Sequence, residues 1–218
     1  MADAEAVFAI CDEIRQDVLR VFPNHKVISV KNPVDLELVS YNEKRDSNVI
    51  AFVGRLVEYK NIKLIFEAMS KSKACFRLIV AGDGEMEKSK HMCHMYGLEE
   101  RVEFLGWVDK PYERLMDAGW LVVASDYEGF SLVIVEALAS GMPVISTPVG
   151  VAPEVIVPGK NGYLYPVKDS DNLAMILDYI WEGKLPMPNS EVCRESVMNY
   201  RKEEVLREFA EQLRNAIG

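Results

Sequence analysis

The sequence from residue 128 to residue 143 reads Glu-Gly-Phe-Ser-Leu-Val-Ile-Val-Glu-Ala-Leu-Ala-Ser-Gly-Met-Pro. The apolar run at 120–124 predicts a short buried strand before it, and residues 125–129 predict a turn. Residues 130–140 carry apolar side chains at helical spacing until Gly141 ends the helix. The amino-terminal end of a helix is thus expected at a sheet edge, where its unpaired N–H groups and its dipole favour an anion or ligand hydroxyls.

Two carboxylates flank this helix start. Glu128 precedes the helix, and Glu136 is expected about two turns into it. At that separation the two side chains are suited to hold different ends of one extended ligand, and they do not share one proton. The sequence therefore predicts a ligand that is both polyhydroxylated and phosphorylated.

The rest of the chain alternates between strands and helices. The predicted strands are residues 49–53, 76–81, 102–105, 121–124, 144–146 and 162–165. The predicted helices are residues 61–71, 85–96, 111–117, 130–140 and 170–181, the last with Ser170 or Asp169 as its N-cap. Repeated strand–helix units with nearly all-apolar strands indicate an α/β fold: a doubly wound parallel sheet with helices on both faces. Ligands of such sheets bind at the carboxyl ends of the strands.

Two smaller segments flank this sheet, which is assigned to residues 46–188. Residues 1–45 are predicted to contain a strand at 4–11, a helix from an Asp12 N-cap to Val21, a strand at 27–30 and a polar linker. Residues 189–218 form a helical segment with an apolar stripe of Val205, Leu206, Phe209, Leu213 and Ile217. Packing of this stripe against the sheet is the favoured interpretation.

Composition limits the possible functions. The chain has 218 residues, 49% hydrophobic and 27% charged, and no apolar run long enough to span a bilayer, so membrane contact is expected to be peripheral at most. A net charge of −9 disfavours nucleic acid as a partner. The four cysteines lack paired spacing, and no signal peptide precedes the first predicted helix, so a cytoplasmic location is expected.

A basic turn follows the first strand of the sheet. Gly54 allows a ligand to approach closely, and Arg55 and Lys60 are placed to reach a diphosphate at the carboxyl end of the strand. A solvated surface turn is the alternative, since short basic pairs are common on surfaces. The anion site predicted at the helix start favours the diphosphate clamp.

Three other motifs are less specific. Residues 82–85, Gly-Asp-Gly-Glu, lack the third glycine of a dinucleotide fingerprint, so a tight turn lining a cleft is favoured over an NAD site. His91, Cys93 and His94 have no second ligand pair, and a solvated helix surface is favoured over a metal site. The main chain at the end of the strand near Trp107 is suited to contact a base, although Trp107 is alternatively a core residue.

In this order the motifs resemble the carboxy-terminal domain of the family-4 retaining glycosyltransferases, which have the two-domain GT-B fold. The matching segments are Gly54-Arg55-Leu56 with Lys60, Ala81-Gly82-Asp83-Gly84, Val102 to Gly106, Glu128-Gly129-Phe130 with Glu136-Ala137, Gly141 to Val144, and Asn161-Gly162-Tyr163. The resemblance runs from about residue 27 to residue 180. The two glutamates, with seven residues between them, are its most specific part.

The resemblance implies a nucleotide-diphosphate sugar as the donor, with uridine diphosphate (UDP) as the expected nucleotide. It implies that Arg55 and Lys60 contact the diphosphate, that Glu136 holds the ribose hydroxyls, and that Glu128 contacts the donor sugar as the catalytic residue. Gly54 belongs to the same donor site.

It further implies that main-chain groups of Gly129, Phe130, Ser131 and Leu132 complete the phosphate and sugar contacts. Trp107 and Val108 are implied to contact the base. Neither a metal nor another cofactor is expected, because cations and helix N–H groups neutralise the leaving diphosphate.

The chain departs from the family pattern in two ways. Asn61 stands where glycine usually follows the clamp lysine, and most of the amino-terminal, acceptor-binding domain is missing. Residues 1 to about 40 resemble the last strand, helix and strand of that domain. The chain is therefore predicted to be half of an enzyme and inactive alone. The apolar faces of residues 4–21 and 205–217 are then expected to pack on each other or on a second copy, as a homodimer.

The sequence thus predicts a hexosyltransferase domain whose acceptor is a glycan or glycolipid of a surface polysaccharide such as lipopolysaccharide. It is expected in the cytoplasm, with peripheral contact to the inner face of the membrane as an option. Two alternatives stay open: a non-catalytic nucleotide-binding or scaffolding module that completes its cleft with a second polypeptide, and a nucleotide-sugar epimerase of related architecture.

Overall fold

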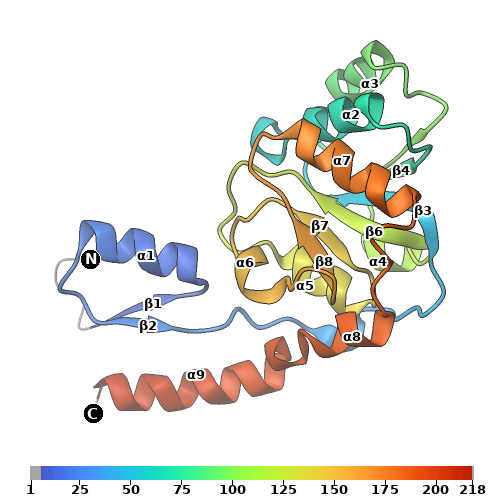
Figure 1. Cartoon of the computed structure of the whole chain (residues 1–218). Coiled ribbons are helices and arrows are strands. Elements are labelled where there is room, and N and C mark those ends of the chain that lie inside the picture. The colour runs from blue at the N-terminus through green and yellow to red at the C-terminus, as the bar shows by residue number, and fades with distance from the viewer. Residues whose placement is uncertain (1–5, 218) are drawn as a thin grey trace.

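The computed structural model describes residues 6–217, and its centre is a six-stranded sheet in which every pairing is parallel (Figure 1). In spatial order the strands are β5 (Val102–Gly106), β4 (Arg77–Ala81), β3 (Asp46–Val53), β6 (Ala118–Val123), β7 (Val144–Ser146) and β8 (Gly162–Leu164). The chain winds outward from β3 in one direction and from β6 in the other. The predicted doubly wound parallel sheet is confirmed.

Helices cover both faces of this sheet. One face carries α2 (Ile62–Lys71), α3 (Met86–Met95) and α7 (Ser170–Trp181), and the other carries α4 (Pro111–Arg114), α5 (Leu132–Ala139), α6 (Ala152–Val155) and α8 (Ser190–Glu195). Along β6, Trp120 and Val122 join the core under α2 and α7, whereas Leu121 and Val123 join the core under α5. Burial on both faces explains why this strand is apolar at nearly every position.

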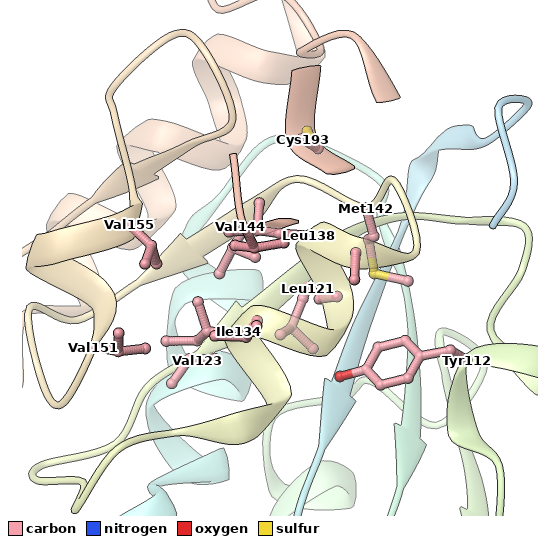
Figure 2. Close-up of a cluster of buried hydrophobic side chains, with 14 of the residues drawn as sticks. Tyr112, Leu121, Val123, Ile134, Leu138, Met142, Val144, Val151, Val155 and Cys193 are labelled. Carbon is pink, nitrogen blue, oxygen red and sulfur yellow. The ribbon is translucent and has the colours of Figure 1, made fainter. Parts of the chain in front are cut away.

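The core beneath α5 consists mainly of aliphatic side chains. In Figure 2, Ile134 and Leu138 of α5 lie against Leu121 of β6 and Val144 of β7, and all four are fully buried. Burying a side chain of this size contributes about 1.5–3 kcal/mol. These contacts fix α5 on the sheet and hold its amino-terminal end at the edge formed by the carboxyl ends of the strands.

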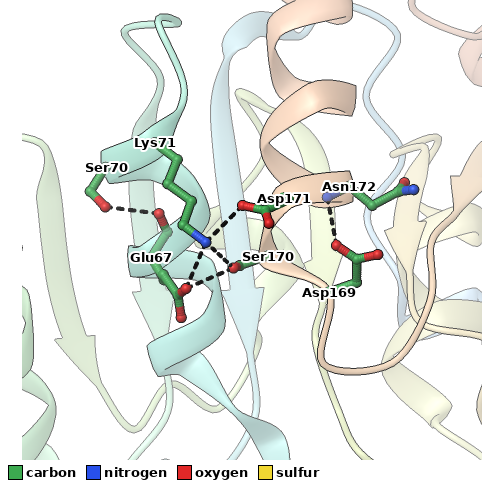
Figure 3. A network of polar contacts seen from close by, with 7 residues as sticks. All are labelled: Glu67, Ser70, Lys71, Asp169, Ser170, Asp171 and Asn172. Atoms are coloured by element: carbon green, nitrogen blue, oxygen red, sulfur yellow. Dashed lines mark hydrogen bonds and ion pairs between the residues drawn. The ribbon is translucent and has the colours of Figure 1, made fainter.

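A polar network joins α2 to α7 on the opposite face (Figure 3). Lys71 Nζ lies 2.7 Å from Glu67 Oε1 and donates to Ser170 Oγ at 2.8 Å. Asp169 accepts the N–H of Asn172 at 2.8 Å and is therefore the N-cap of α7, one of the two caps predicted. Because these lysine and glutamate side chains are more than a third exposed, the network sets the relative position of the two helices more than it adds stability.

The amino-terminal segment forms a small unit beside the sheet (Figure 1). β1 (Val7–Ala9) and β2 (Val27–Ser29) pair in parallel, with α1 (Asp12–Val21) between them in the chain. The strand predicted at 4–11 is shorter, and its residues 4 and 5 lie outside the described residues. After the short 3₁₀ helix η1 (Leu36–Leu38), β3 begins at Asp46, directly after the boundary expected near residue 45.

The carboxy-terminal helix corrects a prediction. After η3 (Met198–Tyr200), α9 (Lys202–Ile217) runs along the β1–β2 unit and not along the main sheet (Figure 1). Phe8 and Phe209 pack edge to face with ring centroids 5.2 Å apart, and Lys31 Nζ lies 3.4 Å from Glu208 Oε2. Packing of the stripe on the sheet is thus wrong, whereas packing of the two terminal apolar faces on each other is confirmed at this pair.

The stripe itself is only partly covered. Val205 is buried, whereas Leu206 and Leu213 are exposed, and the side chain of Ile217 lies outside the described residues. The periodicity correctly identified a helix with one apolar side, but Leu206 lies away from the covered side.

The starts of α1 and α5 also differ from the prediction. Cys11, which has an extended conformation, is the N-cap of α1, and Asp12 is its first residue. Helix α5 begins at Leu132 and not at residue 130, because Ser131 has a left-handed backbone (φ +74°) that an α-helix does not contain. Glu136 therefore lies little more than one turn into α5 and not two.

Candidate functional site

The loops after β3 and β6 meet at the centre of the sheet edge. These two strands are neighbours, and the strand order reverses between them. In open α/β sheets such a reversal separates two loops at the carboxyl ends of the strands and leaves a crevice for a ligand. The candidate site therefore lies at the loops of residues 54–61 and 124–131.

A nearly buried ion pair joins the two loops. Lys60 Nζ lies 2.6 Å from Glu128 Oε1, and the side chains are only 16% and 9% exposed. Ser125 Oγ donates to the same carboxylate oxygen at 2.7 Å. The sequence assigned Lys60 and Glu128 to one site, and the structure brings them into direct contact. Ser125 was not singled out from the sequence.

Aromatic side chains connect the same loops at the surface. The rings of Tyr59 and Tyr127 stack with centroids 4.7 Å apart, and the Asp126 N–H donates to the Tyr59 carbonyl at 2.8 Å. Arg55 is exposed and donates to the Tyr59 hydroxyl at 3.3 Å. Asn61, which stands where the resemblance implies glycine, has a left-handed backbone (φ +54°) and donates to the Asp126 side chain at 3.2 Å. The substitution therefore keeps the turn, because Asn tolerates this conformation.

The glycine turn at residues 82–84 packs against the loop of residues 54–61, which carries Arg55 and Lys60. A Cβ on Gly82 would lie 1.8 Å from the Gly54 carbonyl oxygen, and one on Gly84 would lie 2.7 Å from the Leu56 carbonyl oxygen. The Leu56 N–H donates to the Asp83 carbonyl at 2.6 Å. These glycines let two loop backbones touch, as expected of a tight turn.

The side chains at the start of α5 are buried to different extents. Phe130 is buried against Tyr200, with ring centroids 5.8 Å apart, whereas Gly129 and Leu132 are exposed. Ser131 is only 7% exposed, and its hydroxyl has no hydrogen-bond partner. An unpartnered buried hydroxyl costs free energy unless a ligand or water completes it.

Glu136 lies apart from the Lys60–Glu128 pair. It lines a pocket of about 320 Å³ together with Lys110, Pro111 and Tyr112. Burial raises the pKa of the Glu136 carboxyl above its usual range. The Tyr112 hydroxyl donates to the Val133 carbonyl at 2.7 Å, and burial raises its pKa well above the ordinary value. The two glutamates thus have different surroundings, as expected of groups that hold different parts of a ligand.

Trp107 and Val108 follow β5 at the same sheet edge. Trp107 is 68% exposed, so its interpretation as a core residue is wrong. Val108 is half-buried and packs against the α5 core.

Within residues 6–217, no three His, Cys, Asp or Glu side chains are grouped so that they could hold a metal ion. His94 pairs instead with Glu99, and Cys93 is buried. In the same described part, no helix has both the length and the apolar character needed to cross a membrane.

Comparison with known proteins identifies relatives. The family model described as Glycosyl transferases group 1 matches residues 35–197. An uncharacterised glycosyltransferase of Methanocaldococcus jannaschii is 32% identical over 197 residues, which cover 80% of this chain and 50% of the relative. The lipopolysaccharide 1,6-galactosyltransferase of Salmonella typhimurium is 28% identical over 193 residues, which cover 84% of this chain and 54% of the relative.

A solved structure of a glycosyltransferase has the same fold as this chain. The apo form of the lipopolysaccharide outer core galactosyltransferase WaaB superposes with a TM-score of 0.84 at 25% identity, covering 98% of this chain and 62% of that one. The chain spans about half the length of the curated relatives it matches. Since the family model covers most of the chain and the doubly wound sheet agrees with the fold of WaaB, the chain belongs to the group 1 glycosyl transferases.

Proposed function

We propose that the chain is the carboxy-terminal, donor-binding domain of a family-4 retaining glycosyltransferase. The whole enzyme transfers a hexose from a nucleotide sugar, with UDP as the nucleotide, to a glycan or glycolipid acceptor. The observation that carries this proposal is the nearly buried Lys60–Glu128 ion pair close in the chain to the unpartnered Ser131 hydroxyl. Desolvating a charge pair and a hydroxyl costs free energy, and a phosphorylated, polyhydroxylated ligand completes the hydrogen bonds of both.

The proposed roles follow the chemistry of each group. Arg55 and Lys60 neutralise the leaving diphosphate together with the N–H groups of Gly129 to Leu132. Glu128 accepts hydrogen bonds from hydroxyls of the donor sugar.

Glu136 accepts hydrogen bonds from the ribose hydroxyls, and its pocket receives the nucleoside. Trp107 and Val108 contact the base from the end of β5. Because protein cations neutralise the diphosphate, we propose that transfer uses no metal or other cofactor.

The relatives support the substrate class. The Salmonella relative carries the name lipopolysaccharide 1,6-galactosyltransferase, so a UDP-hexose and a lipopolysaccharide-type acceptor are the substrates we propose. The acceptor-binding domain would lie outside the matched half of such an enzyme. All four cysteines are free, and three are buried, which agrees with a reducing, cytoplasmic location.

The half-length match favours a second candidate, a non-catalytic nucleotide-binding module that completes its cleft with another polypeptide. Both candidates bind a nucleoside diphosphate and differ in transfer activity.

Calorimetric titration with UDP, GDP, ADP and uridine tests the nucleotide proposal. We expect UDP to bind more tightly than uridine, because the diphosphate adds contacts to Arg55 and Lys60. UDP is also expected to bind more tightly than the purine diphosphates. A chain that binds none of these compounds would rule out the donor site.

Substitution of Arg55 by alanine is expected to weaken UDP binding by on the order of 1–3 kcal/mol, because it removes a charge-assisted hydrogen bond to phosphate. Uridine binding is expected to stay nearly unchanged, and so is stability, since Arg55 is exposed. Lys60→Ala is expected to weaken UDP binding by a similar amount. Calorimetry with both ligands measures the difference, and an equal loss for uridine and UDP would contradict the clamp.

Lys60 needs a further control, because it also pairs with Glu128. Lys60→Met leaves a nearly buried carboxylate without its cation, which is expected to destabilise the chain by on the order of 3 kcal/mol. In the double variant Lys60→Met/Glu128→Gln this charge is absent, so stability is expected to recover while UDP affinity does not. Recovery of affinity together with stability would show that Lys60 acts only through the fold.

A further inference from the structure

The amino-terminal end of α1 meets α6 and the turn before it, and a glutamate from each side accepts a backbone N–H from the other. The Glu13 side chain accepts the N–H of Gly150, and Glu154 Oε1 accepts the N–H of Asp12 at 2.7 Å. Each glutamate thus satisfies a backbone donor of the other segment, near the start of a helix. Negative charge is favourable at that position, and a carboxylate–amide hydrogen bond is stronger than a neutral one.

These contacts lie next to the loop that carries Glu128. A Cβ on Gly150 would be 2.6 Å from the Phe130 carbonyl oxygen and 3.0 Å from Glu128 Cβ. The Val151 N–H donates to the same Phe130 carbonyl at 2.8 Å. On the α1 side, the Cys11 thiol donates to the Gly129 carbonyl at 3.3 Å. The loop is therefore held from α1 and from the turn before α6 at consecutive carbonyl groups.

We infer that Glu13 and Glu154 are positioning residues that dock α1 on the Glu128 loop and thereby fix the loop's shape. Together they form what we call the Glu13–Glu154 latch. The inference goes beyond the proposed roles of the donor-site residues, because neither glutamate belongs to that site. It assigns the small amino-terminal unit a part in shaping the site, since α1 and the loop are more than a hundred residues apart in the chain and are brought together by contacts such as Cys11–Gly129 and Glu13–Gly150.

The thiol of Cys11 reports directly on the latch. Cys11 is buried at the contact and belongs to the same core as Cys193, whereas Cys93 is buried in the other core and Cys75 is exposed. If α1 lifts from the loop, Cys11 becomes accessible while Cys93 and Cys193 stay protected. Labelling of a locally opened site follows the population of the open form when opening and closing are fast.

Site-resolved labelling of the full chain with a small thiol reagent, read by mass spectrometry, tests the contact. Glu13→Ala and Glu154→Ala are each expected to speed Cys11 labelling by roughly tenfold, the effect of losing one charge-assisted hydrogen bond. Labelling of Cys193 is expected to stay unchanged. Glu13→Gln keeps an acceptor and is expected to restore part of the protection. The matched control is Asp17→Asn, which removes a charge from α1 at a surface pair with Arg20.

Two further measurements test positioning. Hydrogen exchange of the Val151 amide, which donates to the Phe130 carbonyl of the loop, is expected to rise in both alanine variants and not in Asp17→Asn. If the proposed function holds, these variants also lose more affinity for UDP-galactose, which reaches the loop, than for uridine, which binds near Glu136. A general loss of stability would lower both affinities alike.

Unchanged labelling of Cys11 in both alanine variants would overturn the latch. Faster labelling of Cys11 with unchanged exchange of the Val151 amide would overturn its positioning role. If the unaltered chain binds no nucleotide at all, the proposed donor site fails, and the labelling and exchange results still decide the latch.

Discussion

Substitution of Glu136 by glutamine is expected to raise the midpoint temperature of thermal unfolding and to weaken uridine binding. Burial raises the pKa of this carboxyl in the folded chain. Between the ordinary carboxyl pKa and the raised value, the folded chain binds more protons than the unfolded chain, so stability falls as pH rises through that range. The full cost is present above the raised pKa, and glutamine removes it because it carries no charge.

The same substitution removes the acceptor for the ribose hydroxyls. Uridine and UDP affinities are expected to fall alike, by about tenfold or more, because a hydrogen bond to a charged group is worth about 1.5–3 kcal/mol. For the unaltered chain, uridine affinity is expected to fall as pH drops through the raised pKa, since the protonated acid accepts hydrogen bonds less well. The Glu136→Gln variant is expected to lack this pH dependence.

Differential scanning calorimetry and uridine titration across pH measure the two effects. The control is Glu211→Gln, which changes an exposed carboxylate on α9 and is expected to alter neither quantity. A lower unfolding temperature in Glu136→Gln would show that the carboxylate stabilises the fold. The hypothesis that Glu136 lowers stability in order to bind the ribose would then be wrong.

The sheet and its helices were predictable because each strand is short, apolar and followed by a turn signal. The run from Trp120 to Val123 is apolar on both faces, and only a sheet covered by two helix layers accommodates it. The start of α5 was placed two residues early because the sequence of Ser131 does not reveal its left-handed backbone.

The sequence predicted that Lys60 and Glu128 share one site, but it did not predict that they touch. Lys60 and Glu128 were assigned to one site because both follow strands at the same edge, yet their direct contact depends on β3 and β6 being neighbours. The Tyr59–Tyr127 stack follows from the same adjacency and has no sequence signal of its own. The latch was missed for a similar reason, because Glu13 and Glu154 read as ordinary surface glutamates.

The partner of α9 was mispredicted because periodicity identifies an apolar side of a helix without saying what covers it. Val205 and Phe209 are spaced for one face, and both the main sheet and the β1–β2 unit offer apolar surface. The chain direction after η3 decides between them, and α9 runs away from the sheet (Figure 1).

The 218-residue chain is expected to bind UDP-sugars weakly and to transfer no sugar at a useful rate. Transfer needs an acceptor hydroxyl aligned with the donor carbon, and such alignment supplies about 7–11 kcal/mol of the reduction in barrier. The curated relatives are about twice as long as the matched region, so we expect the residues that align the acceptor to lie in their other half. Without those residues, the contacts to the diphosphate remain but are screened by water.

Assays of this chain with UDP-galactose and simple glycoside acceptors measure transfer, and calorimetry on the same preparation measures binding. Measurable binding without transfer is the expected pair of results, and adding an amino-terminal half in trans is expected to raise transfer. The Glu128→Ala variant, combined with that half, should remove the gain without weakening UDP binding, because Glu128 is proposed to contact the sugar and Lys60 is left free to pair with the diphosphate. Rapid transfer by the unaltered chain alone would mean that residues 1–218 already align both substrates, and the acceptor site would then have to lie among the loops of this sheet edge.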